Sequence, residues 1–158
     1  MRAGEADVLF ERYRETALVA FAHVFPPERY PFPHEAVRDH WRQVAADPLR
    51  DVTVAEVEGD VVGAVVAAGE RLENLFVVPS RWGSGVADAL HDAAVAAGTR
   101  QLDVMEENAR ARRFYERHGW RLDGRREHSE YPPFPALLGY ELSGASRHMI
   151  KASSRLSV

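Results

Sequence analysis

Apolar positions in the first part of the chain recur at the spacing of an amphipathic helix. Over residues 5–25 they lie three or four residues apart with charged residues between them, which predicts a helix that ends before Pro26. A second helix is predicted over residues 34–46, where Trp41 belongs to the inward stripe and Pro48 follows the end. The chain therefore opens with two helices that each bury one face.

The pattern then changes to short runs rich in valine. Residues 52–57 and 61–66 are predicted to form two strands, and the intervening Glu58-Gly59-Asp60 is a hairpin signal. A third strand is predicted over residues 72–78, which Pro79 closes. A sheet therefore follows the two helices.

Helices and strands alternate in the next part of the chain. The pattern predicts a helix over residues 85–97 capped by Gly98, a strand over residues 101–105, and a helix over residues 108–118 that Gly119 stops. Because a strand precedes and follows the first of these helices, the two strands are expected to lie parallel to each other.

Two closing strands are predicted at residues 120–126 and 136–142, joined by a loop with the sequence Tyr-Pro-Pro-Phe-Pro. Together the elements indicate an α/β (α+β) fold with a mixed sheet. The last residues are rich in serine and lack periodicity. We therefore divide the chain into one domain over residues 1–144 and a C-terminal tail over residues 145–158.

The composition fits one ordinary globular domain and narrows the function. The 158 residues are 46% hydrophobic and 28% charged, and the net charge of −4 gives no support to nucleic-acid binding. No apolar run approaches the roughly 20 residues that cross a bilayer, and the N-terminus lacks a signal-peptide core, so we expect a cytoplasmic protein without a membrane partner. The absence of cysteine and of a His-x-x-x-His spacing leads us to expect no metal.

A glycine-bearing turn joins the third strand to the helix that follows it. Gly83 and Gly85 leave the backbone N–H groups at the helix start open to an anion such as a phosphate, although a tight turn alone explains such glycines equally well. The chain lacks the Gly-Lys-Ser/Thr sequence of nucleoside triphosphate-binding loops. Asp88 occupies the place of the third glycine in the dinucleotide-binding fingerprint, so that motif is absent as well. Coenzyme A is the phosphate-bearing ligand that remains as a candidate.

This stretch resembles the cofactor-binding motif of the GCN5-related N-acetyltransferases (GNATs). That motif reads Gln/Arg-x-x-Gly-x-Gly/Ala after a Leu-aromatic-Val-x-Pro strand, and Gly85 and Ala87 fill its last two places. Trp82 stands where the family has Gln or Arg, and Arg81 lies one residue early.

A second stretch, residues 108–120, resembles the family pattern Asn-x-x-Ala-x-x-Phe-Tyr-x-x-x-Gly-Phe. Its matching positions hold Asn108, Ala111, Phe114, Tyr115 and Gly119, and Trp120 replaces the final Phe.

The resemblance covers about residues 51–142 and has consequences for fold and function. It implies a three-layer fold in which helices flank a central mixed, largely antiparallel sheet with a parallel strand pair at the cofactor cleft. It also implies an acyltransferase that moves an acetyl group from acetyl-coenzyme A directly to a primary amine of a small molecule or peptide. Residues 2–7 look like the remnant of the family's opening strand and turn.

The resemblance also implies a set of cofactor-binding residues. Val77 would offer its backbone N–H to the oxyanion, and Asn108 would offer its amide to the pantetheine arm, although Asn108 serves equally well as a helix N-cap. Arg110, Arg112 and Arg113 are candidates for the adenosine phosphate. The full set is Phe76, Val77, Val78, Arg81, Trp82, Gly83, Ser84, Gly85, Val86, Ala87, Asn108, Ala111 and Tyr115.

Two residues are candidates for proton transfer. By resemblance Tyr115 would protonate the departing coenzyme A sulfur, and aromatic packing beside Phe114 is the alternative explanation. Glu73, expected on the same strand face as Val77 four residues later, is the candidate base for the ammonium, directly or through a water, with Glu70 as its competitor.

The acceptor amine and the partners stay open at this point. Aromatic residues from the first two helices, their connection and the late loop are candidates to frame an acceptor pocket: Tyr30, Phe32, Trp41, Tyr131 and Phe134. A homodimer is possible. Two other functions remain, namely a catalytically silent acyl-coenzyme A-binding module of the same fold and a partner-binding domain whose glycine turn holds no ligand.

Overall fold

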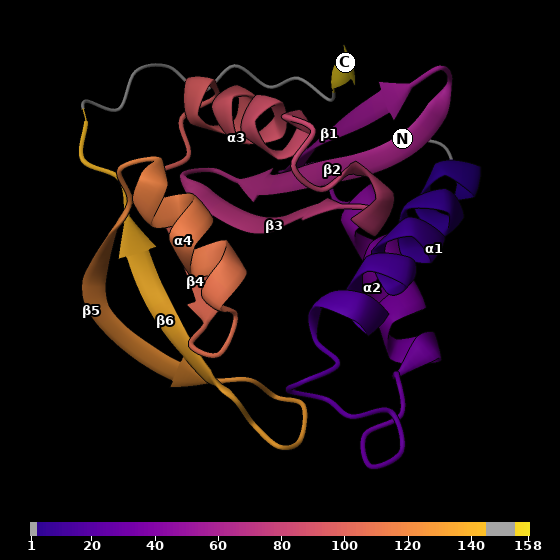
Figure 1. The fold of residues 1–158 in the computed structure, drawn as a ribbon. Helices are drawn as coiled ribbons and strands as arrows, with labels where there is room; N and C mark the ends of the chain where they lie inside the picture. The colour runs from indigo at the N-terminus through magenta and orange to yellow at the C-terminus, as the bar shows by residue number, and fades with distance from the viewer. Residues whose placement is uncertain (1–2, 145–153) are drawn as a thin grey trace.

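Among the described residues, 3–144 and 154–158, one sheet of seven strands forms the centre of the protein, in the order β5-β6-β4-β3-β2-β1-β7 (Figure 1). This arrangement comes from a computed structural model. The strands are β1 (Arg50–Val57), β2 (Asp60–Ala68), β3 (Arg71–Val77), β4 (Gln101–Met105), β5 (Arg121–His128), β6 (Ala136–Glu141) and β7 (Ser154–Ser157). The helices are α1 (Ala3–Ala20), α2 (His34–Ala46), α3 (Val86–Ala96) and α4 (Ala109–Arg117), with a 3-10 turn η1 (Pro79–Arg81).

The sheet is mixed and largely antiparallel, as predicted. The pairs β1/β2, β2/β3, β4/β6 and β5/β6 run antiparallel. The pair β3/β4, which flanks α3, is parallel, and so is β1/β7. The expected hairpin and the expected parallel pair are both confirmed.

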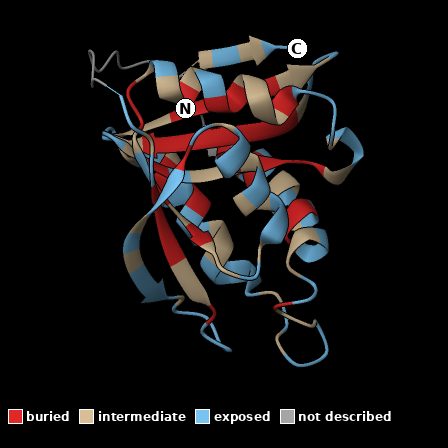
Figure 2. Ribbon diagram, turned by 60° about the vertical axis from the view of Figure 1, so that its left-hand side comes forward, coloured by how far each residue is buried: buried red, intermediate tan, exposed pale blue. Residues whose placement is uncertain are grey.

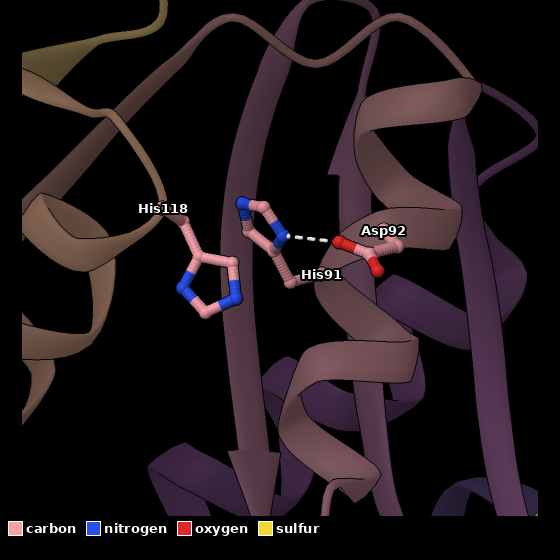
Figure 3. Close-up of side chains that lie close together, drawn as sticks. All are labelled: His91, Asp92 and His118. Carbon is pink, nitrogen blue, oxygen red and sulfur yellow. Dashed lines mark hydrogen bonds and ion pairs between the residues drawn. The ribbon is translucent and has the colours of Figure 1, made fainter.

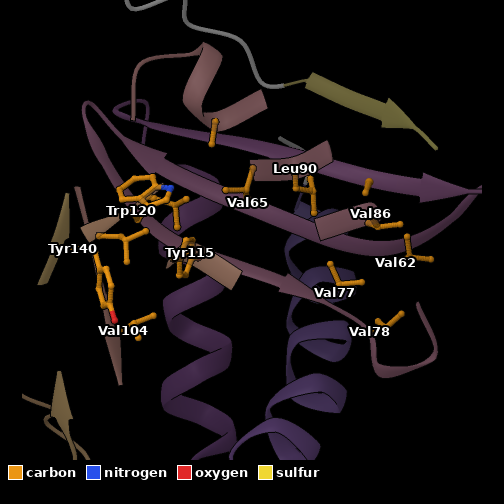
Figure 4. Packing of buried hydrophobic residues seen from close by; sticks show 14 of the residues in the cluster. Val62, Val65, Val77, Val78, Val86, Leu90, Val104, Tyr115, Trp120 and Tyr140 are labelled. Carbon is orange, nitrogen blue, oxygen red and sulfur yellow. The ribbon is translucent and has the colours of Figure 1, made fainter. Parts of the chain in front are cut away.

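Helices cover both faces of the sheet and give three layers. Neighbouring residues of one strand belong to different hydrophobic clusters, since Phe76 packs with α1 and α2 whereas Val77 packs with α3 and α4. Figure 4 shows the cluster that contains Val77, and Figure 2 shows that buried residues concentrate in the central strands. None of the helices within residues 3–144 is long and apolar enough to cross a membrane.

The first helix differs from its predicted bounds at both ends. It begins at Ala3, so the expectation that residues 2–7 keep a remnant of an opening strand is wrong for the described residues of that stretch. Ala, Glu and Asp favour a helix over a strand there. The helix ends at Ala20 instead of residue 25, and turns follow it, in which the N–H groups of Val24 and Phe25 both donate to the carbonyl oxygen of Phe21.

The last strand takes the outer edge of the sheet beside β1. Its four residues pair in parallel register with Thr53–Glu56. Thr53 and Ser154 also share a side-chain hydrogen bond of 3.1 Å. The division of the chain at residue 144 stays a prediction, but the end of the predicted tail adds a strand to the sheet.

Candidate active site

A cleft opens where β3 and β4 diverge. The two parallel strands pair only at Arg71 with Gln101 and at Leu72 with Leu102. Glu73 follows as an extra residue, because Val66 of β2 pairs with Asn74 while the next β2 residue pairs with Leu72. Such a bulge bends a strand away from its neighbour. The space between the two strands belongs to a cavity of about 1000 Å³, at the upper end for ligand pockets.

The backbone of β3 presents an unpaired edge to this cleft. The N–H of Val78 donates to the carbonyl oxygen of Val62 at 2.8 Å, and hydrogen-bonded pairs alternate along an antiparallel ladder. The N–H of Val77 therefore points away from β2, toward the side where β4 has separated. This N–H is a donor aimed at the cavity that Val77 lines.

The predicted glycine turn lies at the start of α3. Gly85 is the N-cap in the left-handed conformation, with φ of 90°, and no side chain caps the helix. A Cβ built on Gly83 or Gly85 meets nothing within 4 Å, so the space in front of the turn is open. Uncapped N–H groups at a helix start favour an anion.

Trp82 connects this turn to both sides of the cleft. Its indole N–H donates to the carbonyl oxygen of Val77 at 2.7 Å. The guanidinium of Arg110, at the start of α4, stacks over the indole ring at 3.6 Å from the ring centroid. Burial lowers the pKa of Arg110. The residue that replaces the family's Gln or Arg therefore holds an arginine from the neighbouring helix at the cleft.

The end of α4 fixes the ring of Tyr115. Gly119 turns the chain with φ of 88°, and the N–H of Trp120 donates back to the carbonyl oxygen of Tyr115 at 3.0 Å. This is a Schellman C-cap, and its usual apolar contact is made by the two rings, whose centroids lie 5.8 Å apart. Tyr115 is buried and lines the cavity, and burial raises the pKa of its phenol. No other described residue forms a hydrogen bond with its hydroxyl.

Asn108 and Arg112 have structural partners. The side-chain oxygen of Asn108 accepts the N–H of Ala111 at 3.2 Å, so the residue is the N-cap of α4 and also lines the cavity. Arg112 donates to the Tyr140 hydroxyl at 3.0 Å and to the carbonyl oxygen of Glu106 at 3.2 Å. These bonds commit Arg112 to the interior side of the helix and leave Arg110 at the cleft.

Glu73 lines the cavity but lies on a different face from the one predicted. The bulge adds one residue between Leu72 and Val77, which lie in the same cluster despite their odd spacing. The expectation that Glu73 shares a face with Val77 is therefore wrong, because strand periodicity breaks at a bulge. Its carboxylate instead pairs with Arg50 Nε at 2.6 Å, and Arg50 also pairs with Asp47 at 2.5 Å.

One wall of the cavity is aromatic. Tyr30, Phe32 and Tyr131 line it as expected, whereas Trp41, on α2, is buried in the cluster that α1 and α2 form with the sheet. Phe134, in the same loop as Tyr131, is exposed and outside the lining.

Two lining residues were missed by sequence reasoning. Tyr13 contacts Asn74, and burial together with the nearby Tyr131 raises the pKa of its phenol while the Asn74 amide opposes the rise. The sequence did contain one indication of this polar contact, because asparagine is a poor strand former and Asn74 lies within the third predicted strand.

The predicted site residues fall into two groups. Those that line the cavity are Glu73, Phe76, Val77, Trp82, Ala87, Asn108, Ala111 and Tyr115. The others form the strand end and turn next to it: Val78, Arg81, Gly83, Ser84, Gly85 and Val86. The competitor Glu70 lies outside the lining, in the turn before β3.

A histidine pair lies beside the site, between α3 and the end of α4 (Figure 3). His91, Asp92 and His118 place ligand atoms within 4.8 Å of one another, as a metal site would. However, Trp120 donates its indole N–H to His91 Nε2 at 2.9 Å, so the proton sits on Nδ1, which donates to Asp92 at 2.9 Å. In this state neither nitrogen of His91 is free to bind a metal.

This arrangement predicts a pH-dependent stability. Burial lowers the pKa of His91 below its ordinary 6.5, so the unfolded chain takes up the proton first as pH falls. The neutral His91 therefore contributes fully to the free energy of unfolding above about pH 6.5. Below that pH this contribution declines, by up to about 1.4 kcal/mol per pH unit. We expect His91→Gln, which keeps an acceptor for Trp120, to lose less free energy of unfolding than wild type between pH 7.5 and 5.5 in urea titrations. Equal losses would contradict this assignment.

Comparison with known proteins agrees with this geometry. Residues 48–122 match the family model described as an acetyltransferase (GNAT) domain. An uncharacterized N-acetyltransferase of Mycobacterium tuberculosis is 32% identical over 91 residues, which cover 51% of this chain and 58% of that protein. The chain thus spans little more than half the length of the curated relative it matches.

Solved structures share the fold. The apo form of YjaB from Escherichia coli superposes with a TM-score of 0.69 at 20% identity, covering 92% of this chain and 95% of that one. The PaiA N-acetyltransferase from Thermoplasma acidophilum, solved in complex with coenzyme A, gives a TM-score of 0.58 at 12% identity, covering 89% and 95%. The molecule has the fold of an acyltransferase domain. Its similarity to the GCN5-related N-acetyltransferase family lies in residues 48–122, somewhat less than half of the chain.

Proposed function

We propose that this protein transfers an acetyl group from acetyl-coenzyme A directly to the primary amine of a small molecule or peptide. One observation carries the proposal: the unpaired edge of β3 and the buried hydroxyl-bearing residue Tyr115 line one cavity, at the end of which the α3 turn lies open. The match of residues 48–122 to the acetyltransferase (GNAT) domain and the coenzyme A complex of the Thermoplasma protein, which shares the fold, support it.

The residues present fit coenzyme A. The open turn at Gly83 and Gly85 suits a pyrophosphate, because its helix start is uncapped and free of side chains. The edge of β3 suits the amide groups of a pantetheine arm, and the Asn108 side chain lies across the cleft. Arg110 adds a positive charge between these two places. Bound there, the molecule supplies its acetyl group as a thioester.

Three groups of the chain have roles in the transfer. The N–H of Val77 is placed to stabilise the negative charge that develops on an acyl oxygen. Tyr115 holds a proton that a departing thiolate can take, and the burial that raises the pKa of its phenol also disfavours an uncompensated thiolate. Glu73, or a water held by it, accepts the proton of the incoming ammonium.

Cofactor binding is the first test. Millimolar acetyl-coenzyme A at about 100 times its Kd should raise Tm by about 5 to 10 °C, because the ligand binds the folded state alone. Fluorescence of Trp82 should change as well, and this change should be absent in Trp82→Phe. If neither signal moves, the proposal fails. If both move but no amine in a broad panel releases free thiol, the silent acyl-coenzyme A-binding module is correct instead.

Glu73→Gln tests the base. We expect kcat/KM to fall at least about 10-fold below the pKa of the acceptor amine and to recover above it, since a base is needed only while the amine is protonated. Asp47→Asn is the matched control, because it removes the other carboxylate that pairs with Arg50 while leaving the cavity lining intact. A parallel loss in both variants would show that the ion pair acts structurally and would assign the proton transfer to another group.

A further inference from the structure

The cavity wall opposite α4 is built from aromatic rings on three separate segments. Tyr13 lies on α1, Tyr30 and Phe32 lie on the connection to α2, and Tyr131 lies in the loop between β5 and β6. Figure 1 shows both loops at the same lower end of the molecule. Prolines at several positions in both loops restrict the backbone, which holds the rings with little entropy left to lose on binding.

The carboxylates that line the same cavity are already paired or lie at its rim. Glu73 pairs with Arg50, and Asp103 pairs with Arg71 and with Arg125 Nη1, the latter at 3.2 Å. Of the described carboxylates in the lining, this leaves Glu107.

Glu107 is exposed to solvent, and an ion pair between an ammonium and an exposed carboxylate contributes little to the free energy of binding. A second ammonium entering the cavity would therefore lose its water without gaining a buried carboxylate, and unpaired charges are costly to desolvate.

We propose that the acceptor is a monoamine, with one primary amino group attached to an apolar body of aromatic size, and not a polyamine or a lysine-rich peptide. This inference rests on the acetyltransferase function proposed above. In the proposed complex the amino group of the acceptor lies toward Glu73 and the edge of β3, and its apolar body packs against Tyr13, Phe32 and Tyr131. Aromatic pairs in offset or edge-to-face contact add to the gain from burying apolar surface.

The discriminating experiment compares amines that differ in one feature. Thiol release from saturating acetyl-coenzyme A is measured with n-hexylamine and 1,6-diaminohexane, which share length and reacting group, and then with phenethylamine and spermidine. We expect kcat/KM to be about 10- to 100-fold higher for the monoamine in each pair, the scale of burying one large apolar group. If the rings act as a cage for a second cation, the diamines are preferred and the inference is overturned.

Two variants in one loop connect the preference to the aromatic wall. Tyr131→Ala should raise KM for phenethylamine about 10-fold or more without changing KM for acetyl-coenzyme A. Phe134→Ala is the matched control, since Phe134 is an exposed ring of the same loop outside the lining. Equal effects of the two variants, or none in Tyr131→Ala, would overturn the assignment.

The outcomes separate this inference from the function on which it rests. Loss of all coenzyme A binding would refute the acetyltransferase proposal itself. Coenzyme A binding with preferred acetylation of spermidine would refute the acceptor class and leave the enzyme intact. If coenzyme A binds and none of the four amines reacts, calorimetric binding to the coenzyme A complex decides: tighter binding of spermidine than of phenethylamine overturns the inference, and the reverse supports it.

Discussion

Replacing Tyr115 by phenylalanine is expected to lower kcat for amine acetylation by about 10²- to 10⁴-fold, the usual contribution of a general acid. The change removes one hydroxyl that has no hydrogen bond to any described residue and keeps the ring contacts with Phe114 and Trp120, at 5.3 and 5.8 Å between centroids. Tm and acetyl-coenzyme A affinity should therefore stay close to wild type. Steady-state thiol release and thermal unfolding measure the two effects separately.

Tyr140→Phe is the control for the loss of a buried phenol hydroxyl. Tyr140 is fully buried on β6, outside the cavity, and its hydroxyl donates to Glu116 at 2.8 Å and accepts from Arg112 at 3.0 Å. Its removal should lower the free energy of unfolding by about 1 to 3 kcal/mol and leave kcat unchanged. If Tyr115→Phe behaves in the same way, Tyr115 is a packing residue and the proposed proton donor is wrong.

The elements of the fold could be predicted because their periodicity is local. The helix at residues 34–46 and the strand at residues 101–105 have the predicted bounds, and Asn108 and Gly119 cap α4 as their types suggest. The start of α1 could not be predicted by analogy with the family that the sequence resembles. Its own Ala, Glu and Asp residues were the better guide.

The geometry of the site depends on features that residue spacing does not encode. The bulge at Glu73 changes the face of every later residue of β3, and no glycine or proline in the strand marks its position. The stack of Arg110 on Trp82 and the pairing of Glu73 with Arg50 join segments that only the folded chain brings together. Residue types therefore led to the proposed chemistry, whereas tertiary contacts determine which of the candidate side chains face the cavity.

Gly85→Glu is expected to weaken coenzyme A binding by about 100-fold or more, and so to remove the rise in Tm that the ligand produces. The new carboxylate would lie at the uncapped start of α3, where it repels phosphate and competes for the same N–H groups, and two lost charge-assisted hydrogen bonds alone amount to this factor. The substitution also strains the backbone, since φ at Gly85 is +90°, at a cost of about 1 to 3 kcal/mol.

Gly59→Glu separates this strain from the loss of binding. Gly59 has φ of +85° in the β1–β2 turn, and a Cβ there also meets nothing within 4 Å, so the same side chain enters a backbone with a similar positive φ in equally open space. Both variants should therefore unfold at a similarly reduced Tm without ligand, and only Gly59→Glu should regain several degrees when acetyl-coenzyme A is added. A folded Gly85→Glu protein that regains as much would place the pyrophosphate elsewhere and leave the glycine turn a purely structural link between β3 and α3.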